Sequence, residues 1–196
     1  MQFKPLEPGI EISGETVGST IDAFRNFPSL AKKYLEKFGL IKPEQAVLDR
    51  RAWYPQEAWL SVHAALLAEV GGNVMFEVGK AIPGGSVPMP PMAKDIYTAM
   101  VALDIGYHLN HRKSGLVMFD PATGQMLEGI GHYTHKPVPG ENRIIVTATN
   151  PYDCDFDRGL LVGLVTKFEP LAKVLHDNRK PCRKKGTNSC TYIVSW

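Results

Sequence analysis

The chain contains 196 residues, of which 44% are hydrophobic and 21% are charged, and this composition is typical of one globular domain with its own core. The formal net charge of +2 argues against a nucleic-acid partner, although residues 179–185 form a basic run. No apolar stretch is long enough to cross a bilayer, and the first residues lack the apolar segment of a signal peptide. We therefore expect a single cytoplasmic domain, residues 1–196, with no membrane span.

Residues 1–112 predict a mainly helical part. After an irregular start, Ser19 or Thr20 can cap the first helix, which Pro28 interrupts. Pro55 suits the first turn of a second helix, because proline has no amide hydrogen to lose there, and Gly71 ends that helix. The predicted elements are helices at residues 19–38, 55–70, 74–81 and 92–111, with a proline-rich loop at residues 83–91.

Residues 113–196 predict a sheet part with one more helix. Leu161, Leu164 and Val165 recur at helical spacing, and Asp155 or Asp157 can cap that helix. The predicted strands are at residues 116–119, 126–133, 143–149, 173–175 and 190–196. This order predicts an α+β fold, in which N-terminal helices pack on an antiparallel sheet and a C-terminal helix and strands complete the domain.

The three cysteines of the chain are the first candidate site. An odd number of cysteines in a reducing compartment argues against a disulfide framework. Cys154 precedes the final helix, while Cys182 and Cys190 bracket a short loop that can bring both thiolates to one zinc ion. His176, Asp177 or water can then supply the fourth ligand. The spacing alone also fits three unrelated core residues.

Histidines and aromatic residues form the second candidate site. Asp104, His108 and His111 share one helix face, while only one of His132 and Tyr133 can face a pocket from their strand. We predict a largely apolar ligand pocket with a few polar anchors. Its expected residues are Trp59, His63, Asp104, Tyr107, His108, His111 and Tyr133.

Four other readings of these histidines stay open. His63 also fits a satisfied core histidine, and the histidines at the end of residues 92–111 also fit cations that complement a helix dipole. A second metal at Asp104, His108 and His111, or a haem ligand among the histidines, is a further alternative. The sequence contains no nucleophile-elbow, Walker or dinucleotide motif, so it gives no support for catalysis and leaves that question open.

Residues 150–196 resemble the 4-vinyl reductase domain family. Its signature is a cysteine before a glycine-containing helix, then a cysteine, a glycine and a second cysteine that enters the last strand. Cys154, Gly159, Cys182, Gly186 and Cys190 match this order. The family shares its fold with haem–nitric-oxide-binding domains and with small subunits of vesicle-tethering transport-particle complexes. Over the helical part, the resemblance extends only to the order of the elements.

The resemblance implies a structural zinc site that closes the C-terminal helix and strands. In aromatic-sensing members, the three cysteines bind zinc together with an acidic residue, usually three positions before the middle cysteine. That position is Arg179 here, so the chain departs from the pattern. Asp177 is the expected substitute, with His176 as the alternative. The resulting ligand set is Cys154, Cys182, Cys190 and Asp177.

The resemblance also implies a function. We expect a sensor or ligand-binding domain for a small hydrophobic ligand, either aromatic or tetrapyrrole-like, whose output passes through a partner or a homodimer. The aromatic helix at residues 19–38 is the expected interface. The first alternative is an enzyme or accessory protein in tetrapyrrole metabolism that acts on a vinyl group. The second alternative is an interaction scaffold like the vesicle-tethering subunits.

Overall fold

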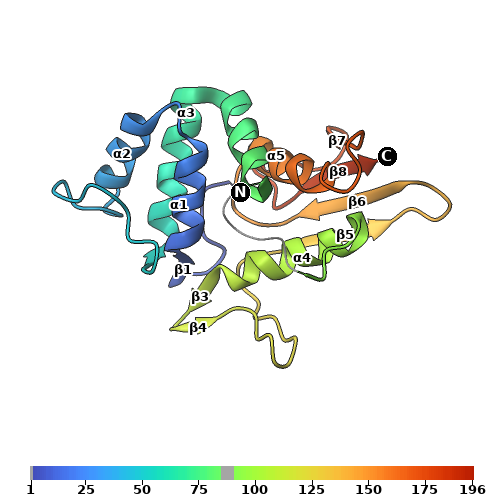
Figure 1. The fold of residues 1–196 in the computed structure, drawn as a ribbon, viewed down its shortest axis with the longest axis horizontal. Coiled ribbons are helices and arrows are strands. Elements are labelled where there is room, and N and C mark those ends of the chain that lie inside the picture. The colour runs from blue at the N-terminus through green and yellow to red at the C-terminus, as the bar shows by residue number, and fades with distance from the viewer. Residues whose placement is uncertain (1, 85–90) are drawn as a thin grey trace.

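A computed structural model describes residues 2–84 and 91–196 of the chain. The fold is α+β, as predicted, with helices and antiparallel sheets around a shared apolar core. Figure 1 shows the first three helices at one end of the molecule and the second sheet at the other. The predicted loop at residues 83–91 falls mainly on residues 85–90, which lie outside the described part. None of the helices in the described ranges is long and apolar enough to span a membrane.

Of the first sheet, the sequence predicted only the strand at residues 116–119. Its strands are β1 (Ile10–Ser13), β2 (Trp53–Pro55), β3 (His111–Lys113) and β4 (Leu116–Val117), and their order in the sheet is β2-β1-β3-β4. All three pairings are antiparallel. Each strand has four residues or fewer, which is too short to show an alternating pattern in the sequence. His111 therefore lies in a strand, whereas the sequence analysis placed it at the end of a helix.

The first predicted helix is two helices, α1 (Gly14–Ala23) and α2 (Pro28–Lys37). The predicted interruption at Pro28 is confirmed, because this proline opens α2. The predicted caps Ser19 and Thr20 were wrong. The hydroxyl of Ser13 accepts a hydrogen bond from the amide of Thr16, so the helix begins directly after β1.

The next helix, α3 (Gln56–Ala81), crosses the predicted break at Gly71 and is followed by a single 3₁₀ turn, Ile82–Gly84. Gly71 has φ 75° and ψ 168°, so the two predicted helices at 55–70 and 74–81 are the arms of one kinked element. The second arm packs closely on α5 (Cys154–Val165). A Cβ atom added at Gly159 would lie 2.0 Å from the carbonyl oxygen of Phe76, so only glycine permits this backbone contact.

Two other predicted helix starts differ from the structure. Helix α4 (Ile96–Leu109) begins after Asp95, whose carboxylate forms a capping box with Thr98, rather than at residue 92. Helix α5 is capped by Asp153, which accepts hydrogen bonds from the amides of residues 155 and 156, and not by Asp155 or Asp157. In both cases the capping side chain stands just before the apolar pattern begins.

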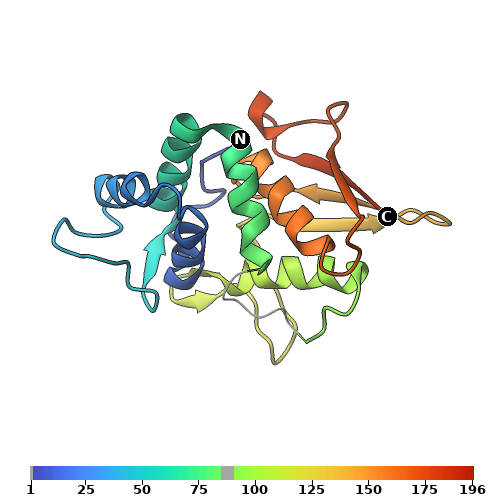
Figure 2. The same ribbon diagram turned by 45° about the horizontal axis from the view of Figure 1, so that its top comes forward.

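The second sheet contains β5 (Tyr133–Pro137), β6 (Arg143–Ala148), β7 (Lys173–His176) and β8 (Cys190–Ser195), in the order β5-β6-β8-β7. Helix α5 lies on this sheet and α4 runs beside β5 (Figures 1 and 2). We call the second sheet together with α5 the C-terminal lobe. The last three predicted strands are confirmed to within two residues at each end.

The predicted strand at residues 126–133 was wrong. Met126 makes only an isolated bridge to Phe119, and the regular strand begins at Tyr133. Gly129 and Gly131 have φ values of 118° and 76°, and these conformations interrupt extended backbone. The predicted strand at residues 116–119 is shorter in the structure, where regular pairing stops at Val117.

Candidate metal centre and buried histidines

The structure brings the three predicted cysteines together from separate elements. Cys154 opens α5, Cys182 lies in the loop after β7, and Cys190 opens β8. All three are free and buried. The Sγ atom of Cys154 lies 3.1 Å from that of Cys190 and 3.5 Å from that of Cys182, and the remaining Sγ distance is 3.8 Å. Thiolates on one tetrahedral zinc ion are about 3.8 Å apart, whereas a disulfide requires about 2.0 Å. The spacing therefore suits a shared metal ion.

His176 joins this group, which we call the cysteine cluster. One ring nitrogen of His176 and the three sulfur atoms all lie within 4.8 Å of one another, so together they could hold a metal ion. The Nδ1 atom of His176 lies 2.8 Å from the side-chain oxygen of Asn178. Its Nε2 atom is buried and has no hydrogen-bond partner in the described part of the chain. Donation from Nδ1 leaves a lone pair on Nε2, which is the usual arrangement for a metal ligand.

Asp177, the expected fourth ligand, points elsewhere. Its carboxylate accepts hydrogen bonds from the Nε atom of Arg179 at 2.9 Å and from the amide of the same residue at 3.1 Å. These hydrogen bonds lower the pKa of Asp177. Arg179 therefore holds the carboxylate of Asp177, which is not among the groups gathered around the cysteines. The geometry places His176 beside the cysteines and leaves Asp177 outside them.

The buried guanidinium of Arg183 is the main positive charge at the cysteine cluster. Both its Nε atom and its backbone amide lie 3.4 Å from the Sγ atom of Cys190. The hydrogen bond from the Cys154 thiol and the charge of Arg183 lower the pKa of Cys190, while the same thiol contact raises the pKa of Cys154. The site is therefore built to stabilise negative charge on sulfur.

Arg183 also connects the cysteine cluster to the interior. Its guanidinium pairs with the carboxylate of Asp157, and both side chains are fully buried. The carboxylate of Asp157 accepts a hydrogen bond of 2.6 Å from the hydroxyl of Tyr133. Asn150 contributes both its backbone carbonyl and its side-chain oxygen to the same guanidinium. Each nitrogen of the guanidinium has at least one partner among the described residues, so the buried charge pair is held within a hydrogen-bonded network.

A second buried group surrounds His63, and we call it the interior cluster. The ring of His63 makes edge contacts with Trp59, Tyr152 and Phe156, at centroid distances of 4.6, 5.4 and 5.0 Å. Neither ring nitrogen of His63 has a hydrogen-bond partner in the described residues. Burial lowers the pKa of His63 to about 3, so the ring is neutral at pH 7.

Gln56 adds a second polar side chain to the interior cluster. It is the first residue of α3, directly after the N-cap Pro55 and about two turns before His63. Its side chain is fully buried. The hydroxyls of Tyr107 and Tyr152 lie near its amide, but neither end of the amide meets the geometry of a hydrogen bond to any described residue. Two buried polar side chains without good partners in one aromatic setting is unusual for a protein core.

Tyr107 and His111, by contrast, are satisfied core residues. The hydroxyl of Tyr107 donates to the carbonyl of Ile130 at 2.7 Å. The Nδ1 atom of His111 lies 2.7 Å from the carbonyl of Tyr107, and its Nε2 atom lies 3.2 Å from the hydroxyl of Tyr152. Burial lowers the pKa of His111 to about 4. Both side chains adjoin the interior cluster, but their polar atoms are already paired.

The remaining predicted pocket residues lie apart from the interior cluster. Asp104 and His108 of α4 instead meet His132, and of these three side chains only that of His108 is fully buried. The seven residues expected to line one pocket thus divide, with five in or near the interior cluster and two beside His132. The sequence analysis missed several residues that matter here. Arg183 was only one of many basic residues in its run, and Gln56, Asp157 and Tyr152 carry no motif; these residues become visible only through burial and contact.

Two hollows are present in the described part of the chain. One, of about 440 Å³, opens beside the cysteine cluster and is lined by His176, Cys182 and Lys184 among others. The other, of about 750 Å³, lies between the end of α1 and the second arm of α3, with Phe24 and Glu77 in its wall. Neither is lined by the histidines of the interior, whose aromatic neighbours fill the space around them.

Comparison with known proteins supports the fold. No family model and no curated protein matches the chain. Among solved structures, an H-NOX protein from S. oneidensis in the Fe(II)NO ligation state is 16% identical, with 94% of this chain and 98% of that chain covered and a TM-score of 0.63. A mutant of the T. tengcongensis H-NOX protein is 19% identical, with 94% of this chain and 97% of that chain covered and a TM-score of 0.62. These likenesses confirm the predicted fold relationship to haem–nitric-oxide-binding domains.

Proposed function

We propose that this protein is a small-molecule-binding sensor domain whose ligand contacts the interior cluster. The observation that carries the proposal is His63, a fully buried side chain in an aromatic cage, whose two nitrogen atoms have no hydrogen-bond partner among the described residues. A buried polar group without a partner costs about 1–3 kcal/mol. Gln56 adds to this cost in the same region. A ligand that supplies hydrogen bonds to these side chains offsets the cost and explains why apolar residues do not occupy the two positions.

The cysteine cluster would hold a structural zinc ion. Three thiolates and one imidazole are a common structural zinc donor set, and four protein ligands leave no open position for chemistry. Such an ion would tie the start of α5 to β7 and β8, which are the elements that carry Cys154, His176 and Cys190. His176 would be the fourth ligand in place of Asp177. Arg183 would offset part of the negative charge of the three thiolates.

Haem does not fit the residues of the interior. Several of the similar solved structures are H-NOX proteins, and haem or porphyrin distortion is the subject of two of the similar structures. In this chain, Cβ atoms added at Gly79 and Gly163 would lie 2.1 and 2.2 Å from backbone oxygens across the α3–α5 contact, so the two helices leave no slot for a macrocycle there. His63 and His111 are enclosed by side chains. We therefore propose a ligand no larger than about one aromatic ring. Because aromatic side chains fill the space around His63, such a ligand would have to displace some of them to reach its ring.

The scaffold alternative has one observation in its favour, because the interior is filled by the protein's own side chains. A stable hetero-oligomer recovered by pull-down would support it. The predicted interface helix offers less than expected, since Phe24 and Tyr34 are buried within the chain and only Phe27 is exposed. Homodimer formation, cytoplasmic location and membership of the 4-vinyl reductase family remain predictions.

Thermal unfolding with phenol and benzamide as probes tests the ligand proposal. We expect at least one probe to raise the Tm of the parent protein, because a ligand that binds the folded state at 100 times its Kd stabilises it by about 2.7 kcal/mol. His63→Leu should be at least as stable as the parent without a probe, because the unpaired nitrogens are gone. It should show no probe-dependent rise.

His135→Leu is the matched control, because this partly buried histidine lies on β5, and it should keep the probe response of the parent. An equal Tm rise in His63→Leu and the parent would show that the ligand binds elsewhere. A marked loss of stability in His63→Leu would show that the histidine is an ordinary core residue.

A further inference from the structure

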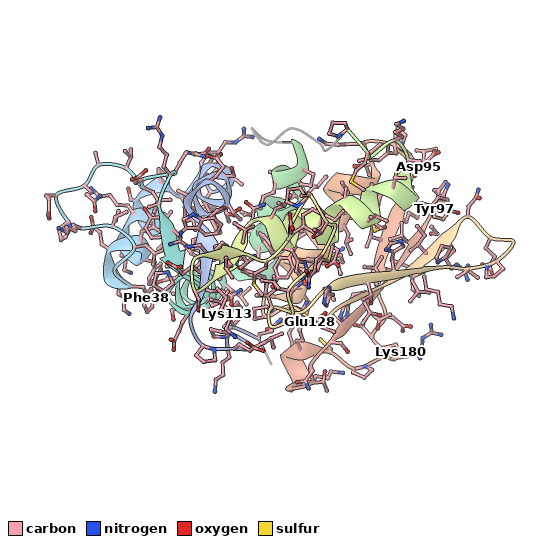
Figure 3. The ribbon with its side chains drawn as sticks, turned by 90° about the horizontal axis from the view of Figure 1, so that it is seen from below. Phe38, Asp95, Tyr97, Lys113, Glu128 and Lys180 are labelled. Atoms are coloured by element: carbon pink, nitrogen blue, oxygen red, sulfur yellow. The ribbon has the colours of Figure 1, made fainter. Side chains whose placement is uncertain are left out.

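A third group of side chains lies outside both clusters described above. Asp104 and His108 project from α4, and His132 comes from the segment that precedes β5. One donor atom from each of the three residues lies within 4.8 Å of the others. Glu128, labelled in Figure 3, adds a carboxylate from the same segment, and its Oε2 atom lies 3.1 Å from the Nε2 atom of His132. We call this group the Asp104 cluster.

His108 is the decisive member of the Asp104 cluster. Its side chain is fully buried, and its Nδ1 atom lies 2.8 Å from the backbone carbonyl oxygen of Asp104. That contact requires the proton to be on Nδ1, so the Nε2 atom carries a lone pair. The Nε2 atom is also buried and has no partner among the described residues. A histidine whose first nitrogen is fixed by a backbone carbonyl, and whose second is an unpaired acceptor, is prepared to bind a cation.

Asp104 is oriented by the backbone of the C-terminal lobe. One carboxylate oxygen accepts the amide hydrogen of Tyr133 at 2.8 Å, and the other lies 2.9 Å from the Nδ1 atom of His132. Donor atoms bound to one tetrahedral zinc ion at about 2.0–2.1 Å lie about 3.3 Å apart. The 2.9 Å between Asp104 and the Nδ1 atom of His132 is close to that separation. The rings of His108 and His132 are 4.6 Å apart between centroids.

A purely structural hydrogen-bond network accounts for only part of this arrangement. The two carboxylates satisfy both nitrogens of His132, but they leave the buried Nε2 atom of His108 unpaired. A metal ion bound through Nε2 would give that atom its missing partner, and it would replace one of the two protons through which His132 contacts the carboxylates. The side chain of His132 is 23% exposed, so an ion can enter from solvent without local unfolding.

We propose that Asp104, His108 and His132 form a second divalent-metal site, with Glu128 as an additional carboxylate at its rim. Two imidazoles and a carboxylate suit zinc and the neighbouring first-row metals, whereas the cysteine cluster offers mainly sulfur. Three protein ligands leave one position open to water or to an exogenous group, unlike the closed set at the cysteine cluster. This site is independent of the cysteine cluster and of the ligand proposed for the interior.

Zinc stoichiometry of the full chain tests this proposal. After chelation, the parent protein should take up two zinc ions per chain, as counted by native mass spectrometry at increasing zinc concentration. His132→Gln should take up one at the concentration that saturates the parent, with affinity for the second ion reduced by at least about 100-fold. Asp104→Asn should lose the same ion, and His135→Gln, on the adjacent strand, should retain both.

Cobalt provides the readout that separates the two sites, because cobalt bound to thiolates gives an intense charge-transfer band and cobalt bound to nitrogen and oxygen does not. His132→Gln should keep the thiolate band of the parent, and circular dichroism should confirm that it is folded. A parent protein that binds one zinc ion, or a His132→Gln variant that still binds two, would overturn the second site. If the cobalt-loaded parent showed no thiolate band, that result would instead contradict the proposed zinc ion at the cysteine cluster.

Discussion

The cysteine cluster and the interior cluster differ in how their polar atoms are satisfied. At the cysteine cluster, Arg183 contacts Cys190 and Asn178 fixes the ring of His176, so the donor atoms are held in place before any ion binds. At the interior cluster, the ring of His63 is held only by aromatic edges, and its nitrogen atoms have no partner in the described residues. The first region is a site that an ion alone completes, whereas the second requires a molecule with hydrogen-bonding groups.

The two regions also differ in what they contribute to the fold. The cysteine cluster joins the start of α5, the end of β7 and the start of β8. The interior cluster sits where α3 and α5 pack, and buried apolar side chains stabilise that contact on every side. Removal of a ligand from the cysteine cluster should therefore lower the stability of the protein. Replacement of a polar side chain in the interior cluster by an apolar one should not. This difference can be tested at each region separately.

The largest expected effect is at the cysteine cluster. Cys182→Ser removes a thiolate ligand, and we expect it to destabilise the protein by about 5 kcal/mol or more, because structural zinc contributes folding free energy directly. The Tm should fall by roughly 10 °C or more for a chain of this length. Addition of a strong chelator to the parent should produce a similar fall, and chelator should have little further effect on the variant.

Asn188→Ala is the matched control for this experiment, because Asn188 is exposed in the same loop between the second and third cysteines. It should leave the Tm within a degree or two of the parent. Equal Tm values for Cys182→Ser and the parent would mean that the three thiols are ordinary core groups. The cysteine cluster would then contribute no zinc-dependent stability to the fold.

The next largest effect is at the buried charge pair that links the two regions. Arg183→Met leaves the carboxylate of Asp157 buried without its cation, and such a loss costs about 3–5 kcal/mol. Chemical denaturation should show this as a lower midpoint with an unchanged slope. The double variant Arg183→Met, Asp157→Asn should recover a large part of the loss, because the amide oxygen can still accept the hydrogen bond from Tyr133.

If the double variant were as unstable as Arg183→Met alone, the cost would come from lost packing and lost contacts to Cys190 rather than from an unpaired charge. The network would then belong to the cysteine cluster and would not connect it to the interior. The two outcomes decide whether the regions share an energetic link or are only neighbours.

These regions were accessible to sequence reasoning to different degrees. The cysteine cluster lies within 37 residues of chain, from Cys154 to Cys190, and thiols are rare enough for their spacing and local motif to be informative. The interior cluster combines α3 with residues of α5 and its preceding loop, and it consists of residue types that occur throughout any core. Sequence spacing could place Trp59 and His63 on one stripe of a helix. It could not show that the ring nitrogens of His63 have no hydrogen-bond partner among the described residues.

Other errors have the same cause. Pairing over long sequence separations created the first sheet, in which Ile12 lies opposite both Tyr54 and His111. The strands β1, β2 and β3 are each too short for the local sequence to indicate them. Helix α4, by contrast, was found because its apolar character and its extent are local properties, and only its ends were misplaced.

The smallest expected effect concerns the ligand that the sequence left undecided. His176→Ala removes the imidazole nitrogen from the cysteine cluster, and we expect zinc affinity to fall by about 10–100-fold, or roughly 1.4–2.7 kcal/mol, as water takes the fourth position. Asp177→Asn should change the affinity by less than about threefold, because its carboxylate is held by Arg179. Competition with a zinc chelator of known affinity measures both variants.

His176→Cys sharpens the same comparison, because a thiolate at this position should restore tight binding and add a fourth sulfur to the cobalt spectrum. A strong loss of affinity in Asp177→Asn, with little change in His176→Ala, would reverse the assignment and require the loop around Arg179 to rearrange when zinc binds. That result would also weaken the contrast between the two regions. The cysteine cluster would then need a conformational change to become complete, as the interior cluster needs a ligand.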